Sequence, residues 1–211
     1  MKSDKQENRK NKITEIKTFP VPFALEESKE NIAINASNSP SKPKKEQIIN
    51  QAINFHLQGN IPEAIKNYSY CIDQGFSDPN VFSNYGAILR NLGKLKDAET
   101  CFRKAIEINP NFAEAHSNLG QILRDRGNLQ EAELSCRKAI EIKPDFADAH
   151  YNMGLILRDL GNLQEAELST RKAIEIKPNY AEAHYNRGII LNDLGNLREA
   201  ELSYRNAIKI K

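Results

Sequence analysis

Apolar and small side chains recur three and four positions apart through most of the chain, which is the spacing of one face of an amphipathic α-helix. The block that begins at Ala113 contains two such runs. The first comprises Ala115, Leu119, Gly120, Ile122 and Leu123, and the second comprises Leu129, Ala132, Cys136, Ala139 and Ile140. The pattern predicts two helices in this block, each with one buried face.

The residues between the runs predict a tight turn. Gly127 can adopt the left-handed conformation that ends a helix, and Asn128 followed by Glu131 is typical of the cap that starts the next one. The same capping pattern begins at Asn111, Asp145, Asn162, Asn179 and Asn196. Because the connection is short, we expect each pair of helices to pack antiparallel.

The whole block recurs every 34 residues without an insertion. The five copies cover residues 45–78, 79–112, 113–146, 147–180 and 181–211. One helix pair cannot bury its apolar faces alone, so consecutive copies must stack to form a core. The sequence therefore predicts an all-α protein, a right-handed α-solenoid of five antiparallel helix pairs over residues 45–211.

The repeat resembles that of the tetratricopeptide repeat (TPR) family, whose signature is a bulky residue, Leu-Gly, Tyr or Leu, Ala, Phe or Tyr, Ala and Pro. These positions are His116, Leu119, Gly120, Leu123, Ala132, Cys136, Ala139 and Pro144. The first copy departs from the signature, as terminal repeats commonly do, with Ile48, Gln51, Ala52 and Phe76. Residues 113–120 are also similar to the repeats of O-linked N-acetylglucosamine transferases. The resemblance implies that the first helix of each repeat lines a concave face on which partners bind.

One position of this expected face is an asparagine in every copy, and we call these five residues the asparagine column: Asn50, Asn84, Asn118, Asn152 and Asn186. A carboxamide both donates and accepts, so a column of them could hold an extended peptide by its backbone. The other side chains expected on the same face are Ser117, Gln121, Tyr151, Tyr185, Arg90, Arg124, Arg158, Asp125, Asp159 and Asp193. The alternative is that the asparagines bond only to neighbouring helices.

The sequence favours binding over catalysis. His116, His150 and His184 recur with the repeat, but equivalent positions lie of order 10 Å apart, too far to share a metal ion, and they occupy the signature's bulky position. No catalytic constellation or phosphate loop stands out. We therefore expect a non-catalytic peptide- or protein-binding scaffold with no cofactor and no metal. The alternative readings are a targeting segment of, or accessory to, a transferase whose chemistry lies elsewhere, and a self-assembling structural module.

Charge and composition limit which classes of partner and which cellular compartment are expected. The chain carries 30 Lys and Arg against 28 Asp and Glu, which argues against nucleic acid or a membrane as partner. Residues 1–44 are polar and predict a disordered arm, interrupted by Phe19-Pro-Val-Pro-Phe23, which is either a short docking motif or an incidental apolar patch. Without an apolar leader or a disulfide pattern, we expect a cytoplasmic protein.

The last repeat of the array predicts a second binding surface, separate from the concave face. The fifth copy stops at Lys211, and the helix pair that contains Leu191, Ala200, Leu202, Tyr204 and Ile208 has no further repeat to cover it. Exposed apolar surface of this kind favours a partner or a second copy. The sequence therefore allows a homo-oligomer formed through the C-terminal repeat.

Overall fold

The computed structural model describes residues 44–210, so the predicted arm, including the Phe19–Phe23 motif, lies outside the described residues. The described part is helical and contains no strand. Its helices are α1 (Lys45–Leu57), α2 (Ile61–Asp73), α3 (Pro79–Asn91), α4 (Leu95–Ile108), α5 (Ala113–Asp125), α6 (Leu129–Ile142), α7 (Ala147–Asp159), α8 (Leu163–Ile176), α9 (Ala181–Asp193) and α10 (Leu197–Ile210).

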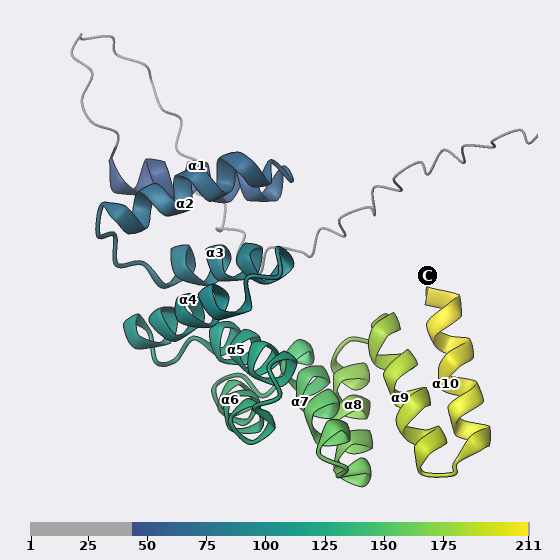
Figure 1. The fold of residues 1–211 in the computed structure, drawn as a ribbon. Helices are drawn as coiled ribbons and strands as arrows, with labels where there is room; N and C mark the ends of the chain where they lie inside the picture. Colours follow the sequence, from purple (N-terminus) through teal and green to yellow (C-terminus); the bar gives the residue numbers. More distant parts are fainter. Residues whose placement is uncertain (1–43, 211) are drawn as a thin grey trace, which may run out of the picture.

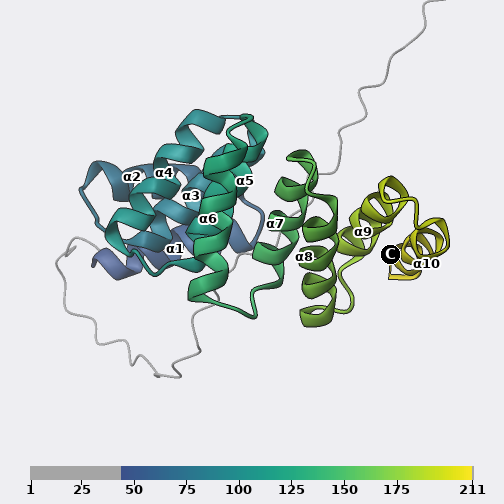
Figure 2. The same cartoon turned by 90° about the horizontal axis from the view of Figure 1, so that it is seen from below.

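Each 34-residue block forms one helix pair, and the pairs stack in chain order. The first helix of every pair begins at the first residue of its block. The two helices of a pair pack against each other, and each second helix packs against the first helix of the next pair. Figures 1 and 2 show the resulting curved stack, with α1 at one end and α10 at the other. The predicted solenoid of helix pairs is confirmed.

The helix pairs can pack closely because a glycine of the first helix faces the second. A Cβ on Gly120 would lie 2.4 Å from the sulfur of Cys136, and one on Gly154 would lie 2.3 Å from Oγ1 of Thr170. Between the helices, Gly127 adopts φ +80°, the left-handed conformation predicted for the turn. Alanines of the second helices, such as Ala132, are fully buried in the same contacts.

The predicted cap positions hold for the second helices but not for the first helices, and the predicted side-chain hydrogen bonds do not form. α6 and α8 do begin directly after Asn128 and Asn162, but neither side chain accepts a capping hydrogen bond. α5, α7 and α9 begin one residue later than the predicted caps Asn111, Asp145 and Asn179, so that the N-cap positions are held by Phe112, Phe146 and Tyr180. Phe112 packs in a core cluster with Ala105 and Ala115, so tertiary packing fixes how the chain enters α5.

The recurring histidines join each first helix to the loop before it. Nε2 of His116 lies 3.0 Å from the carbonyl oxygen of Pro110, and His150 and His184 make the same contact, at 2.9 Å, to the prolines at 144 and 178. All three rings are half-buried. Within residues 44–210, no group of His, Cys, Asp and Glu side chains is placed to hold a metal ion.

The first helices form the inner face of the stack. They touch across pair boundaries, α3 with α5, α5 with α7 and α7 with α9, whereas contacts between second helices are marginal at most. Neighbouring elements of a curved solenoid come closest on the inside of the curve, so the first helices line the concave side. Among the described helices, none is long and apolar enough to cross a membrane.

Candidate functional site on the inner face

The five residues of the asparagine column do not share one environment. Asn84 and Asn152 are buried, Asn118 and Asn186 are half-buried, and Asn50 is exposed. The five carboxamides are therefore not equally accessible to a ligand. The structure divides the column into residues that join helices and residues that remain accessible.

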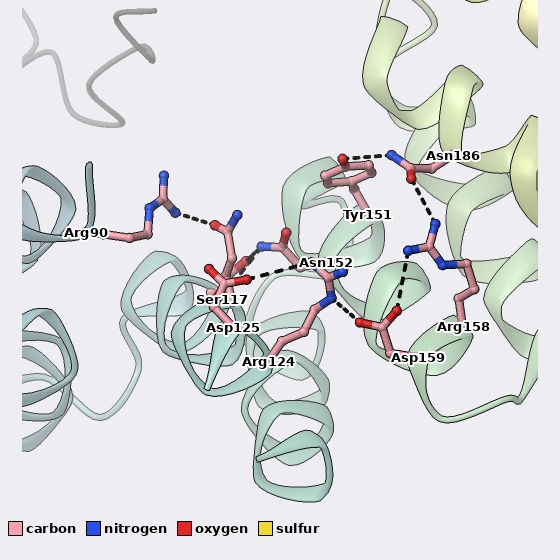
Figure 3. A network of polar contacts seen from close by, with 10 residues as sticks. Arg90, Ser117, Arg124, Asp125, Tyr151, Asn152, Arg158, Asp159 and Asn186 are labelled. Carbon is pink, nitrogen blue, oxygen red and sulfur yellow. Dashed lines mark hydrogen bonds and ion pairs between the residues drawn. The ribbon is translucent and has the colours of Figure 1, made fainter. Parts of the chain in front are cut away.

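Two asparagines bond to the helix before them. Nδ2 of Asn152 on α7 donates to Oγ of Ser117 on α5 at 3.0 Å, and Nδ2 of Asn186 on α9 donates to the hydroxyl oxygen of Tyr151 on α7 at 2.9 Å (Figure 3). Ser117 is itself buried, which removes it from the surface that a ligand could touch. Asn152 uses its NH2 group in this contact, while its carbonyl oxygen accepts no hydrogen bond from the described residues.

Asn84 is enclosed between the first two pairs. Its Nδ2 and the hydroxyl group of Tyr68 are both buried and lie close to each other, but they do not meet hydrogen-bond geometry. Burial raises the pKa of Tyr68 well above its usual value. At this end of the column the asparagine is therefore an interior residue whose NH2 group has no hydrogen-bond partner among the described residues.

The arginine and aspartate side chains of the inner face pair with each other across the repeat boundaries. Nε of Arg124 on α5 donates to Asp159 on α7 at 2.6 Å, and Arg158 contacts the same carboxylate at 3.4 Å (Figure 3). Arg158 also donates to Oδ1 of Asn186 on α9 at 3.3 Å. The arginine and aspartate side chains of the inner face therefore largely neutralise one another in the protein without a ligand.

Arg90 and Gln121 extend the same network toward the first pairs. The guanidinium group of Arg90 on α3 donates to Oε1 of Gln121 on α5. Burial lowers the pKa of Arg90, and the nearby carboxylate of Asp125 partly offsets this. Asp125 in turn lies 3.8 Å from Arg124. A continuous polar network thus runs along the inner face from α3 to α9.

The predicted residues that remain accessible are fewer than the sequence suggested. Asn118 is half-buried, and its side chain has no hydrogen-bond partner among residues 44–210. Asn50, Tyr185 and Asp193 are exposed, and so are Asp125 and Asp159, although both of these carboxylates contact arginines. Asn118 lies on α5, the first helix of the third of the five pairs, which also carries Gln121, Arg124 and Asp125 of the polar network.

Sequence profiles identify the repeat. A TPR profile matches residues 86–123 and 120–161, and two tetratricopeptide repeat profiles match residues 147–180 and 170–201. The chain is a tetratricopeptide repeat protein. A search of the curated proteins found no match to this chain.

Solved TPR structures share the fold at low sequence identity. MamA 41-end from Desulfovibrio magneticus RS-1 is 20% identical, with a TM-score of 0.67 over 81% of this chain and 97% of its own. YrrB, described as a TPR protein with an unusual peptide-binding site, is 22% identical, with a TM-score of 0.61 over 78% of this chain and 84% of its own. PilF of Pseudomonas aeruginosa is 16% identical, with a TM-score of 0.70 over 79% of this chain and 76% of its own.

Sequence reasoning missed Tyr180, which precedes α9 and supports a residue predicted for the inner face. Tyr180, at the last position of the fourth block, packs its ring against Tyr151 with the ring centres 5.0 Å apart. Burial raises the pKa of Tyr180. The signal was available, because the same position is aromatic in Phe112 and Phe146, but the 34-residue alignment alone did not show which surface it supports.

Proposed function

We propose that this TPR protein is a non-catalytic scaffold whose inner face holds an extended polypeptide. The observation that supports this most directly is Asn118. Its carboxamide lies on α5 without a hydrogen-bond partner among the described residues, while its equivalents Asn152 and Asn186 are tied to neighbouring helices. A carboxamide with a free donor and a free acceptor can bond to both groups of a peptide unit.

The charge pairing on this face supports a polypeptide backbone as the main feature recognised. Arg124 and Arg158 are already satisfied by Asp159, so the face has little excess charge with which to select an acidic or basic partner. Each backbone hydrogen bond contributes about 0.5–1.5 kcal/mol net. Affinity would therefore rise with the number of repeats that the peptide covers, and the fold likeness to the peptide-binding protein YrrB is compatible with such a role.

The test begins with a peptide selected from a displayed library of random extended peptides on the immobilised protein. Its dissociation constant is then measured by calorimetry for the wild type and for Asn118→Ala. We expect the substitution to weaken binding about 2- to 12-fold, the range that corresponds to one lost hydrogen bond.

Asn162→Ala is the matched control. Asn162 is exposed at the turn between α7 and α8, and its side chain makes no capping bond, so the same change of residue type should leave the affinity unchanged. Equal affinities for Asn118→Ala and wild type, with equal helical content, would remove the inner-face asparagine from the binding account.

The likeness of residues 113–120 to O-linked N-acetylglucosamine transferase repeats leads to a narrower proposal, in which the array directs a transferase to its substrate. We also propose that the protein acts in the cytoplasm. Incubation of the purified chain with nucleotide-sugar donors should give no transfer, because the scaffold account assigns the chemistry to another domain or chain. Turnover by the chain itself would contradict that assignment.

A further inference from the structure

A groove lies on the outer side of the array between the second helices of the first two pairs. Second helices of neighbouring pairs make marginal contacts at most, so α2 and α4 stand apart and α3 forms the floor between them. The cavity has a volume of about 760 Å³. Its apolar lining includes Ile72 of α2 and Phe82, Tyr85 and Leu89 of α3. We call this cavity the outer groove.

The outer groove is wider than the same place in the next pair. The cavity between α4 and α6 has a volume of about 490 Å³ and is lined in part by Leu134. The residue at the equivalent position of the outer groove is Thr100, whereas the last two pairs have Leu168 and Leu202 there. A threonine in place of the leucine of the later repeats leaves apolar surface of α3 uncovered at this one boundary.

The floor of the outer groove is held in place by the surrounding helices. The hydroxyl oxygen of Tyr85 accepts a hydrogen bond at 3.1 Å from the hydroxyl group of Ser69 on α2. Phe82 packs against the core cluster that contains Ala105 and Phe112. Both Tyr85 and Phe82 are half-buried. A preformed groove with aromatic side chains suits an extended, proline-containing segment.

The rim of the outer groove offers one cation that the fold does not use. Arg103 and Lys104 of the rim are paired with glutamates of α4 and α6. Lys94, at the start of α4, is exposed and has no ion-pair partner within residues 44–210. The groove is therefore suited to a segment with apolar rings and an adjacent acidic stretch.

The chain contains such a segment, and we propose that Phe19-Pro-Val-Pro-Phe23, which lies outside the described residues, binds in the outer groove. Its two prolines favour an extended backbone, which separates the two rings by about 13 Å at roughly 3.3 Å per residue. The lining of α4 from Lys94 to Glu107 spans about 20 Å at 1.5 Å per residue, so both rings fit along it. Glu26 and Glu27, directly after the segment, would lie beside Lys94.

The connection to the array is long enough for this contact. Residues 24–43 join the segment to Lys44 and span roughly 65 Å when extended. Helices about 20 Å long and about 10 Å apart place all of the outer groove within roughly 30 Å of the start of α1. A tether of this kind gives an effective concentration in the millimolar range, so the segment needs little affinity of its own. The contact is on the outer side and does not depend on peptide binding at the inner face.

Photo-cross-linking of the full chain identifies what the segment touches. p-Benzoylphenylalanine replaces Phe23 and keeps an aromatic ring there, and mass spectrometry locates the residues that it links on irradiation. We expect links within one chain to the lining of the outer groove between residues 72 and 107. Links to the inner face, such as Asn118, would overturn the proposal. Links between two chains would overturn it as well, because a second copy would then supply the segment.

Competition with a synthetic peptide measures how far the groove is occupied. The peptide comprises residues 15–30 and is titrated by calorimetry into the full-length wild type and into Phe19→Ser with Phe23→Ser, whose own segment lacks the rings. We expect the wild type to bind the peptide about tenfold more weakly, because a tethered segment at millimolar effective concentration competes with a peptide of roughly 0.1 mM affinity. Equal affinities, or no binding to either chain, would show that the segment does not occupy the groove.

Substitutions in the groove locate the peptide on the array. In the Phe19→Ser, Phe23→Ser background, Thr100→Glu places a charge on the apolar lining and Lys94→Glu repels the acidic stretch. Each should weaken peptide binding about fivefold or more.

Leu168→Glu and Asn128→Glu are the matched controls. They make the same change at the equivalent positions of the fourth and third pairs, both residues are exposed, and neither should alter the affinity. All variants are compared at equal helical content by circular dichroism. Groove variants that bind like the controls would contradict the outer groove as the site.

Discussion

At the residue scale, the neighbour across the repeat boundary determines whether an inner-face asparagine is available. Asn152 bonds to Ser117, Asn186 bonds to Tyr151, and Asn118 has no such partner among the described residues. The sequence predicted that these carboxamides share a face, because they recur with the period. It could not predict which would be buried, because that depends on side chains about 35 residues away and on how closely two helices approach.

The glycines of the first helices give a prediction at the same scale. Gly120→Ala should lower the free energy of unfolding, since overpacking against Cys136 costs about 1–3 kcal/mol and the gain in helix propensity is about 1 kcal/mol. With Cys136→Ala in place, the sulfur that blocks the new methyl group is gone, and the added cost of Gly120→Ala should be much smaller. Urea unfolding of the four variants measures this coupling. Equal effects of Gly120→Ala in both backgrounds would show that Cys136 does not limit the contact.

At the element scale, the turns are encoded locally and the helix starts are not. Gly127 ends α5 with the predicted left-handed conformation, because no neighbouring contact is needed to favour glycine there. The start of α5 instead follows Phe112, whose burial in the core outweighs the capping preference of Asn111. A capping pattern is a local signal, and in this protein packing between repeats overrides it.

A side-chain cap does form at the start of α3, and it makes this difference measurable. Oδ1 of Asp78 accepts hydrogen bonds from the backbone nitrogens of Asn80 at 2.9 Å and Val81 at 3.3 Å at the start of α3. Asp78→Ala should therefore lower the stability of the array by about 1 kcal/mol, and Asn128→Ala should have little effect, because its side chain caps nothing. Urea midpoints of the two variants compare them directly. If Asn128→Ala lowered the stability more than Asp78→Ala, the conclusion that Asp78 caps a helix and Asn128 does not would be contradicted.

At the scale of the whole molecule, the period of 34 residues was enough to predict the stacked helix pairs, because a pair of this composition can bury its apolar faces only against its neighbours. The inner face follows from that stacking, and its neutral polar network from Arg90 to Asn186 follows from contacts between repeats. The account therefore describes binding as distributed: an extended peptide would contact several first helices, each through a few weak contacts.

A truncation series of the selected peptide tests this most directly. Adjacent first helices are about 10 Å apart and an extended chain rises about 3.3 Å per residue, so each repeat corresponds to roughly three peptide residues. Calorimetry on peptides shortened three residues at a time should show the affinity falling at each step, by about 2- to 12-fold per lost backbone hydrogen bond. An affinity that stays constant until a single short segment is removed would contradict binding along the inner face.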